Sequence, residues 1–179
     1  MVENNNIISW SKDYFLHWSD FQADVNLSAY EDSFSKITYH HTWVISSEMV
    51  NGEIFFLISE VKLETQFLKH LSWVRLQNAS PTLLTHEQGH FDLAEFMKQY
   101  FEDQINKKFY GIKYSTRGKN EEQRRQFARE DSCLLIIKEL EECFDNLAKE
   151  RKKYDEETEF GKNISKQNEY DKKFRSLRM

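Results

Sequence analysis

Two long stretches of the chain contain almost no residue that would break a helix. Residues 82–109 include a single glycine, and residues 121–153 include neither glycine nor proline. Ser80 is suited to the N-cap of the earlier stretch, Pro81 to its first helical position, and Gly111 is placed to end it. Apolar residues of the later stretch recur at helical spacing. We therefore expect two long helices, followed by a turn and a short C-terminal helix.

The first half of the chain has the pattern of β-strands. Alternate residues from Ile37 to Ile45 are apolar or aromatic, apart from one histidine, which is typical of a half-buried strand. Residues 51–52, Asn-Gly, are the pair that two-residue type I′ hairpin turns prefer, and residues 53–64 predict a second long strand. Residues 7–10 predict an edge strand. The expected fold class is α+β, an N-terminal antiparallel sheet with a hairpin followed by long helices, in a single domain spanning residues 1–179.

Composition excludes several classes of protein. The chain is 39% hydrophobic and 15% aromatic, which argues against disorder. Its 25 basic and 30 acidic residues form no basic stripe with interleaved aromatics, so we expect no nucleic-acid partner. No apolar run is long enough to span a membrane, and the N-terminus does not resemble an export signal. We expect a protein that stays inside the cell or one whose export signal has been removed.

The two cysteines are not expected to form a disulfide with each other. Cys133 and Cys143 are ten residues apart on one predicted helix. At 1.5 Å per residue they would lie about 15 Å apart, too far for an S–S bond. Buried free thiols are the expected state.

Five residues in the first predicted helix, 86–90, have the spacing of a metal site. His86 and His90 are four residues apart and so project from one face of the helix. Two imidazole nitrogens at this spacing can reach one zinc ion at about 2.0–2.1 Å each. Glu87 sits beside the first histidine, where it can act as a general base toward a water molecule that the zinc polarises. The pattern predicts a zinc-dependent hydrolase.

Other residues of this helix have less certain roles. Gly89 costs about 1 kcal/mol of helix propensity relative to alanine, and its missing side chain would let another segment approach closely. Asp92 suits either a role in holding an imidazole or a surface or packing role. Glu95, five residues after His90, is poorly spaced to bind the same ion.

The residues around the motif resemble those of a bacterial family, domain of unknown function 922, whose members are described as predicted secreted zinc-dependent proteases. The resemblance is strong over residues 72–95 and moderate elsewhere, and it runs in order along almost the whole chain. The matching residues are Ile8-Ser9-Trp10, His17-Trp18-Ser19-Asp20-Phe21, Ser72-Trp73-Val74, Leu83-Leu84, His86-Glu87-Gln88-Gly89-His90-Phe91-Asp92, Glu95, Tyr154-Asp155-Glu156-Glu157-Thr158, Gly161, Gln167 and Tyr170. The resemblance implies a zincin-like metallopeptidase domain that binds zinc and acts on a peptide or protein substrate.

The chain departs from the family at one position that matters. Phe160 stands where the family has a downstream histidine, the natural third zinc ligand, and no histidine follows His90. An acidic residue is one replacement, with Glu159 or Asp155 nearest in sequence and Glu159 taken as the expected third ligand. An upstream histidine is another, with His41 preferred over the other three (His17, His40 and His70). The third outcome is an impaired site that keeps the fold.

Three functions follow from these alternatives. The first is a zinc hydrolase, most simply a peptidase, with His86 and His90 as ligands and Glu87 as the base. The second is a degenerate member that acts as a binding or interaction module, which the phenylalanine at position 160 motivates. The third is a metal-independent protein in which the motif is structural.

Overall fold

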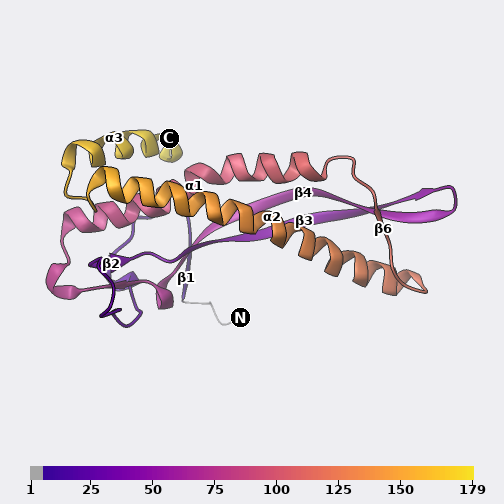
Figure 1. Ribbon diagram of the computed structural model, residues 1–179, viewed down its shortest axis with the longest axis horizontal. Coiled ribbons are helices and arrows are strands. Elements are labelled where there is room, and N and C mark those ends of the chain that lie inside the picture. Colours follow the sequence, from indigo (N-terminus) through magenta and orange to yellow (C-terminus); the bar gives the residue numbers. More distant parts are fainter. Residues whose placement is uncertain (1–5) are drawn as a thin grey trace. The chain divides into compact units, whose positions relative to one another are not determined.

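Long helices and an antiparallel sheet make up most of the computed structural model, which describes residues 6–179 (Figure 1). Helices account for 52% of the residues and sheet for 22%, with the N-terminal sheet preceding the long helices. The chain therefore belongs to the α+β class, as its sequence predicts. Within the described range no helix is both long and apolar enough to cross a membrane.

The elements follow one another in an order close to the predicted one. The helices are α1 (Pro81–Phe109), α2 (Glu121–Thr158) and α3 (Ile164–Phe174). The strands are β1 (Ile7–Ser9), β2 (Ser33–Phe34), β3 (Ile37–Val50), β4 (Glu53–Leu68), β5 (Trp73–Val74) and β6 (Tyr114–Ser115). Four short 3-10 helices are η1 (Trp18–Asp20), η2 (Lys69–Leu71), η3 (Leu76–Asn78) and η4 (Arg175–Arg178).

The sheet is built around the predicted hairpin. Its order is β1-β4-β3, and the short strand β6 also pairs with β4. Asn51 and Gly52 join β3 to β4 with φ angles of 51° and 84°, and positive values at both turn residues are what a type I′ turn requires. The predicted edge strand is also confirmed, because Ile7 pairs with Leu68 in an antiparallel ladder. Strands β2 and β5 form a separate two-stranded sheet that the sequence did not reveal.

The chain packs into two compact units. Unit 1 contains residues 6–40, 64–98 and 147–179 of the described chain. Unit 2 contains residues 41–63 and 99–146. The single domain expected for residues 1–179 stays a prediction.

Helix α1 is unusual because one stretch of it, in unit 1, is buried on every side. It begins as predicted, with Ser80 Oγ accepting a hydrogen bond of 3.1 Å from the backbone N–H of Leu83. All nine residues from 86 to 94 are buried. Contacts with this stretch come from Tyr39, Phe67 and Tyr154, which are themselves buried. Since polar groups in such a place need partners, the polar residues of this stretch define where to look for a site.

Unit 2 has a core of its own. Residues from β4, α1 and α2 fill it, namely Phe56, Ile58, Val61, Leu63, Phe101, Ile105, Phe109, Ala128, Ile136, Leu140 and Cys143. Both cysteines are free, as expected from their spacing, but only Cys143 is buried and Cys133 is half-buried.

Candidate metal centre

The motif residues on α1 do not all point the same way. Successive residues of an α-helix are rotated by about 100°, so Glu87 points in a different direction from the two histidines. His86, Glu87 and His90 are 1%, 3% and 4% exposed, respectively. The two histidines lie about 40° apart around the helix and therefore share a face, as their spacing predicts.

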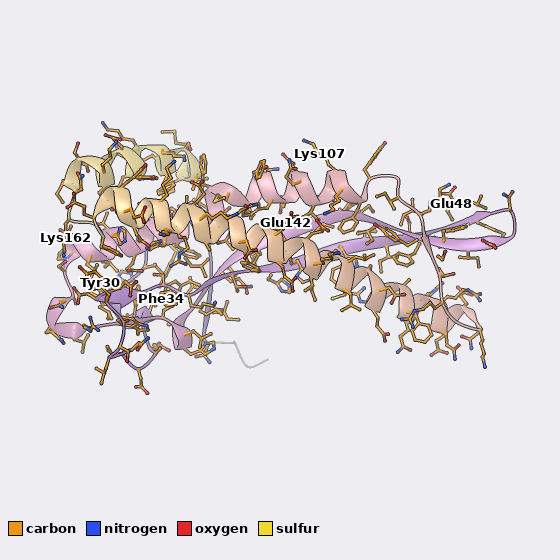
Figure 2. All side chains as sticks on the ribbon, viewed as in Figure 1. Tyr30, Phe34, Glu48, Lys107, Glu142 and Lys162 are labelled. Carbon is orange, nitrogen blue, oxygen red and sulfur yellow. The ribbon has the colours of Figure 1, made fainter. Side chains whose placement is uncertain are left out.

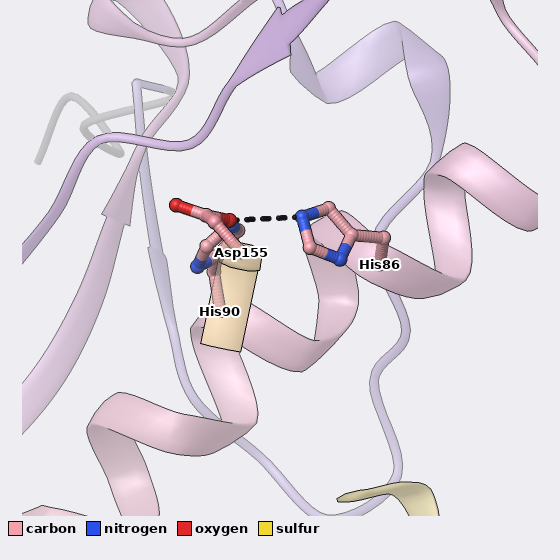
Figure 3. A group of neighbouring side chains, drawn as sticks. All are labelled: His86, His90 and Asp155. Carbon is pink, nitrogen blue, oxygen red and sulfur yellow. Dashed lines mark hydrogen bonds and ion pairs between the residues drawn. The ribbon is translucent and has the colours of Figure 1, made fainter. Parts of the chain in front are cut away.

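Asp155 of α2 meets both histidines. Its Oδ1 atom lies 3.1 Å from His86 Nε2 and 3.0 Å from His90 Nε2, and Figure 3 shows the three side chains converging. One ligand atom from each residue lies within 4.8 Å of the other two. Within residues 6–179, this is the one group of three or more histidine, cysteine or acidic side chains arranged to hold a metal ion.

Two of the three separations between ligand atoms in this group are close to those of a zinc site. Two ligand atoms at about 2.0–2.1 Å from a tetrahedral zinc ion lie about 3.3 Å from each other. The two imidazole–carboxylate separations, 3.0 and 3.1 Å, are close to that value. Two histidines and one carboxylate also form a normal shell for catalytic zinc, with the fourth position left for water or substrate.

The charge states of the group suit a cation as well. Burial alone would raise the pKa of Asp155, but hydrogen bonds with the two imidazoles outweigh it and hold this pKa well below its usual range. Burial, assisted by the nearby Arg151 guanidinium, lowers the pKa of His90. An ionised carboxylate and a neutral imidazole are the forms that bind a metal ion.

The third member of the group is Asp155 and not the preferred Glu159. The sequence indicated that α2 would end near residue 153, which would put both acidic residues in a turn. The helix continues to Thr158, so Asp155 lies on its last turns and projects from a fixed position. Glu159 follows the end of the helix with a φ angle of 50°, is exposed, and lies outside the group. Which acidic residue lies beside the two histidines therefore depends on the length of one helix.

The upstream histidines do not join the group either. His41 belongs to unit 2, where its ring stacks on Trp43 with ring centroids 5.4 Å apart. His17, His40 and His70 are also outside the group. Phe160, in place of the histidine of the resembling family, packs its ring edge-on to His86 at a centroid distance of 6.4 Å.

Residues of α2 and α3 contact the imidazole of His86 at its ring face and at Nδ1, the nitrogen that does not face Asp155. Its Nδ1 atom lies 3.4 Å from Gln167 Oε1 and 3.3 Å from Thr158 Oγ1. Its ring stacks on Tyr154, with centroids 4.7 Å apart and planes 6° from parallel. Partners of this kind fix which nitrogen of a ligating histidine carries the proton, and here they leave Nε2 to face Asp155.

Tyr154 reaches the helix because Gly89 has no side chain. A Cβ atom at position 89 would lie 2.0 Å from Tyr154 Oη, far inside van der Waals contact. The close approach that the glycine predicted is therefore confirmed. The buried hydroxyl lies 3.1 Å from the backbone oxygen of His86, to which it donates, and it accepts a hydrogen bond of 2.8 Å from Gln167 Nε2. Burial raises the pKa of Tyr154, so the phenol stays neutral.

His90 is held less completely than His86. Its Nδ1 atom is buried and has no hydrogen-bonding partner within the described residues. Leaving such an atom unsatisfied costs about 1–3 kcal/mol. This imidazole is instead oriented by two contacts. Its Nε2 atom meets Asp155, and its ring lies edge-on to the Tyr154 ring, with centroids 5.0 Å apart.

Glu87 lies about 60° around the helix from His90 and has partners of its own. Ser33 Oγ donates a hydrogen bond of 2.6 Å to Glu87 Oε1, and Ser35 Oγ donates to Glu87 Oε2. Arg151 lies in the electrostatic field of Glu87 and Asp155; burial lowers the pKa of this guanidinium, and the two carboxylates oppose that shift. The site thus combines a possible cation-binding group with a separately anchored carboxylate.

Asp92, in the buried stretch, and Glu95, just after it, bond to residues outside the metal-binding group. Asp92 accepts hydrogen bonds from Trp10, Gln88 and Arg178, and within the described residues none comes from an imidazole, which favours a packing role. Glu95 accepts from Thr65 and lies outside the group, as its spacing predicts.

Sequence reasoning missed three residues that contribute to the site. Ser33 lies in strand β2 and Ser35 follows it, and this strand is too short to give a periodic signal, although the alternation of the two serines around Phe34 is a weak one. Arg151 lies four residues before Asp155 on α2, and this spacing becomes informative only once that stretch is known to be helical.

Comparison of the chain with models of known protein families, with curated proteins and with solved structures gave no match. The assignment of the site therefore depends on the geometry described above.

Proposed function

We propose that this protein is a zinc-dependent hydrolase that acts on peptide or protein substrates. One observation carries the proposal, the convergence of His86, His90 and Asp155 on one point, with the buried carboxylate of Glu87 on the same helix and in electrostatic interaction with His90. The resemblance of residues 72–95 to the predicted secreted zinc-dependent proteases supports the same function.

Each residue of the site has a chemical role in this proposal. The two imidazoles and the Asp155 carboxylate hold the cation, and a bound zinc ion supplies Lewis-acid polarisation. Glu87 accepts a proton from the attacking water, whose oxygen bonds to the substrate carbonyl carbon. As the C–N bond breaks, Glu87 returns the proton to the departing nitrogen.

The proposal is tested by separating metal binding from proton transfer. We expect the wild-type protein, purified without added metal, to contain about one zinc per chain and to hydrolyse fluorescein-labelled casein. Glu87→Gln should keep the zinc and lose at least about 100-fold in rate, because general-base catalysis contributes about 10²–10⁴-fold. Glu95→Gln is the matched control, since this carboxylate is on the same helix but bonds to Thr65 and Lys98. Unchanged activity in Glu87→Gln, or a wild-type protein that binds no zinc, would overturn the proposal.

A metal-binding module without catalysis is the second candidate. The observation that favours it is that both oxygens of Glu87 already accept hydrogen bonds from serine hydroxyls. This candidate predicts stoichiometric zinc with no hydrolysis of casein, and Glu87→Gln would then alter neither property.

A further inference from the structure

Three consecutive residues around strand β2 alternate sharply in exposure. Ser33 and Ser35 are 5% and 0% exposed, whereas Phe34, labelled in Figure 2, is 40% exposed. Successive side chains of an extended segment point to opposite faces, so both serines project to one side. That side holds Glu87, and each hydroxyl donates to a different oxygen of its carboxylate.

The segment that carries the two serines is fixed at both of its ends. Strand β2 pairs with β5 in an antiparallel ladder. Before it, the N–H of Arg75 donates to the backbone oxygen of Asp32 at 2.8 Å. After it, the N–H of Lys36 donates to Ser72 Oγ, and the backbone oxygen of Lys36 accepts from the N–H of Leu68, both at 2.9 Å. The hydroxyls therefore meet the carboxylate from a position set by the backbone rather than by a mobile loop.

The exposed face of the segment contacts a second charged group of the site. The Arg151 guanidinium lies 5.5 Å from the centroid of the Phe34 ring, within the range of a cation–π contact. The segment 33–35 thus bonds to the carboxylate on one face and packs against the arginine on the other.

Two hydroxyl donors have a defined effect on a carboxylate. A carboxylate oxygen has two lone pairs, so one serine bond to each oxygen leaves one lone pair on each oxygen unused. With both oxygens held, the group can no longer rotate about its Cγ–Cδ bond without losing two charge-assisted hydrogen bonds. Orientation is therefore restricted while the capacity to accept a proton is kept.

We propose that Ser33 and Ser35 are positioning residues that hold the Glu87 carboxylate in the orientation in which it accepts the proton during hydrolysis. This inference rests on the proposed hydrolase function. It assigns the two serines no contact with the metal ion or the substrate, so their effect should reach the reaction only through Glu87.

The experiment compares Ser33→Ala, Ser35→Ala and the double variant with the wild-type protein. Ser33→Thr keeps a hydroxyl at the more accessible of the two positions. Ser132→Ala is the matched control, because it removes another fully buried serine hydroxyl, one that bonds to Trp43 and the backbone of Arg129. For each variant, kcat and KM are measured on fluorescein-labelled casein, and Co²⁺ affinity and its absorption spectrum are measured separately.

We expect the double variant to lose about 10–100-fold in kcat, the effect of a misplaced catalytic group, with KM unchanged. The Co²⁺ affinity and spectrum should match the wild type, since the metal ligands are untouched. Ser33→Thr should keep most of the wild-type kcat. In a Glu87→Gln background, the serine changes should have no further effect on the residual rate, because residues that act through one group are not additive.

Several results would overturn the inference. A double variant with wild-type kcat would show that the hydroxyls do not position the base. A loss of Co²⁺ affinity of about 10–100-fold in the serine variants would show that they support the ligands instead. An additional loss of rate in the Glu87→Gln background would show that they act independently of Glu87. The failure of the proposed function is distinguishable, because in that case the wild-type protein itself would not hydrolyse casein.

Discussion

Replacement of Gly89 by alanine sets two physical effects against each other. Helix propensity favours alanine over glycine in a helix interior by about 1 kcal/mol. The structure opposes the change, because the new Cβ atom would lie 2.0 Å from Tyr154 Oη and 2.7 Å from Tyr154 Cζ. Carbon atoms in contact are about 3.5–4.0 Å apart, so the ring would have to retreat by more than about 1 Å.

Tyr154 has little freedom to retreat. Its residue is 0% exposed, its ring stacks on His86, and its hydroxyl bonds to the backbone of His86 and to Gln167. Overpacking a core costs about 1–3 kcal/mol, and each disrupted hydrogen bond adds about 1 kcal/mol. After the gain in propensity, we expect Gly89→Ala to destabilise the fold by about 2–4 kcal/mol and to lower Tm by about 5–15 °C.

Urea unfolding and thermal unfolding of the wild type and Gly89→Ala measure this effect. The control is the same change in a Tyr154→Leu background, where the smaller side chain should relieve much of the added cost. Since the ring of Tyr154 supports the imidazole of His86, zinc affinity should fall along with stability. A variant stabilised by the propensity value, about 1 kcal/mol, would refute the close contact between the two helices.

Other parts of the structure make further predictions. Gly161→Ala should destabilise the fold by about 2–4 kcal/mol in urea unfolding. Position 161 has a φ of 82°, and the added Cβ atom would lie 2.8 Å from the Cβ atom of His86. An unchanged urea midpoint would contradict this. Burial raises the pKa of the Cys143 thiol to about 11. At pH 8, iodoacetamide should therefore alkylate Cys133 first, and Cys143 should become reactive only as the pH rises toward 11. Equal alkylation rates of the two cysteines at pH 8 would be inconsistent with the structure. Arg178→Met should lower the free energy of unfolding by about 1–3 kcal/mol, because it removes a 2.6 Å ion pair with the buried Asp92. An unchanged free energy of unfolding would show that the C-terminal segment is not anchored at Asp92.

The elements with strong periodicity could be predicted from the sequence. The alternation from Ile37 to Ile45, the Asn-Gly turn and the breaker-free stretches each correspond to an observed element. Strands β2 and β5 have two residues each, too few for a period-two pattern to show. Their place is decided by tertiary hydrogen bonds, which a single sequence does not display.

Only the part of the site that depends on local helical spacing could be predicted from the sequence. Helical spacing alone brings His86 and His90 to one face, so this pair could be found from the sequence. The choice between Asp155 and Glu159 depends on where α2 ends, and the charged residues around position 153 contain no breaker and little apolar periodicity. Tyr154 and Thr158 are both 0% exposed and one turn apart, and their burial accompanies the helix to its observed end.

The ligand set His86, His90 and Asp155 is the central claim, and zinc affinity tests it most directly. We would measure zinc content and affinity for the wild type, Asp155→Ala and Glu159→Ala by metal analysis and competition with a chelator. The proposed function predicts about one zinc per chain in the wild type and in Glu159→Ala, and a loss of more than about 100-fold in affinity in Asp155→Ala. Stoichiometric, tightly bound zinc in Asp155→Ala would contradict it.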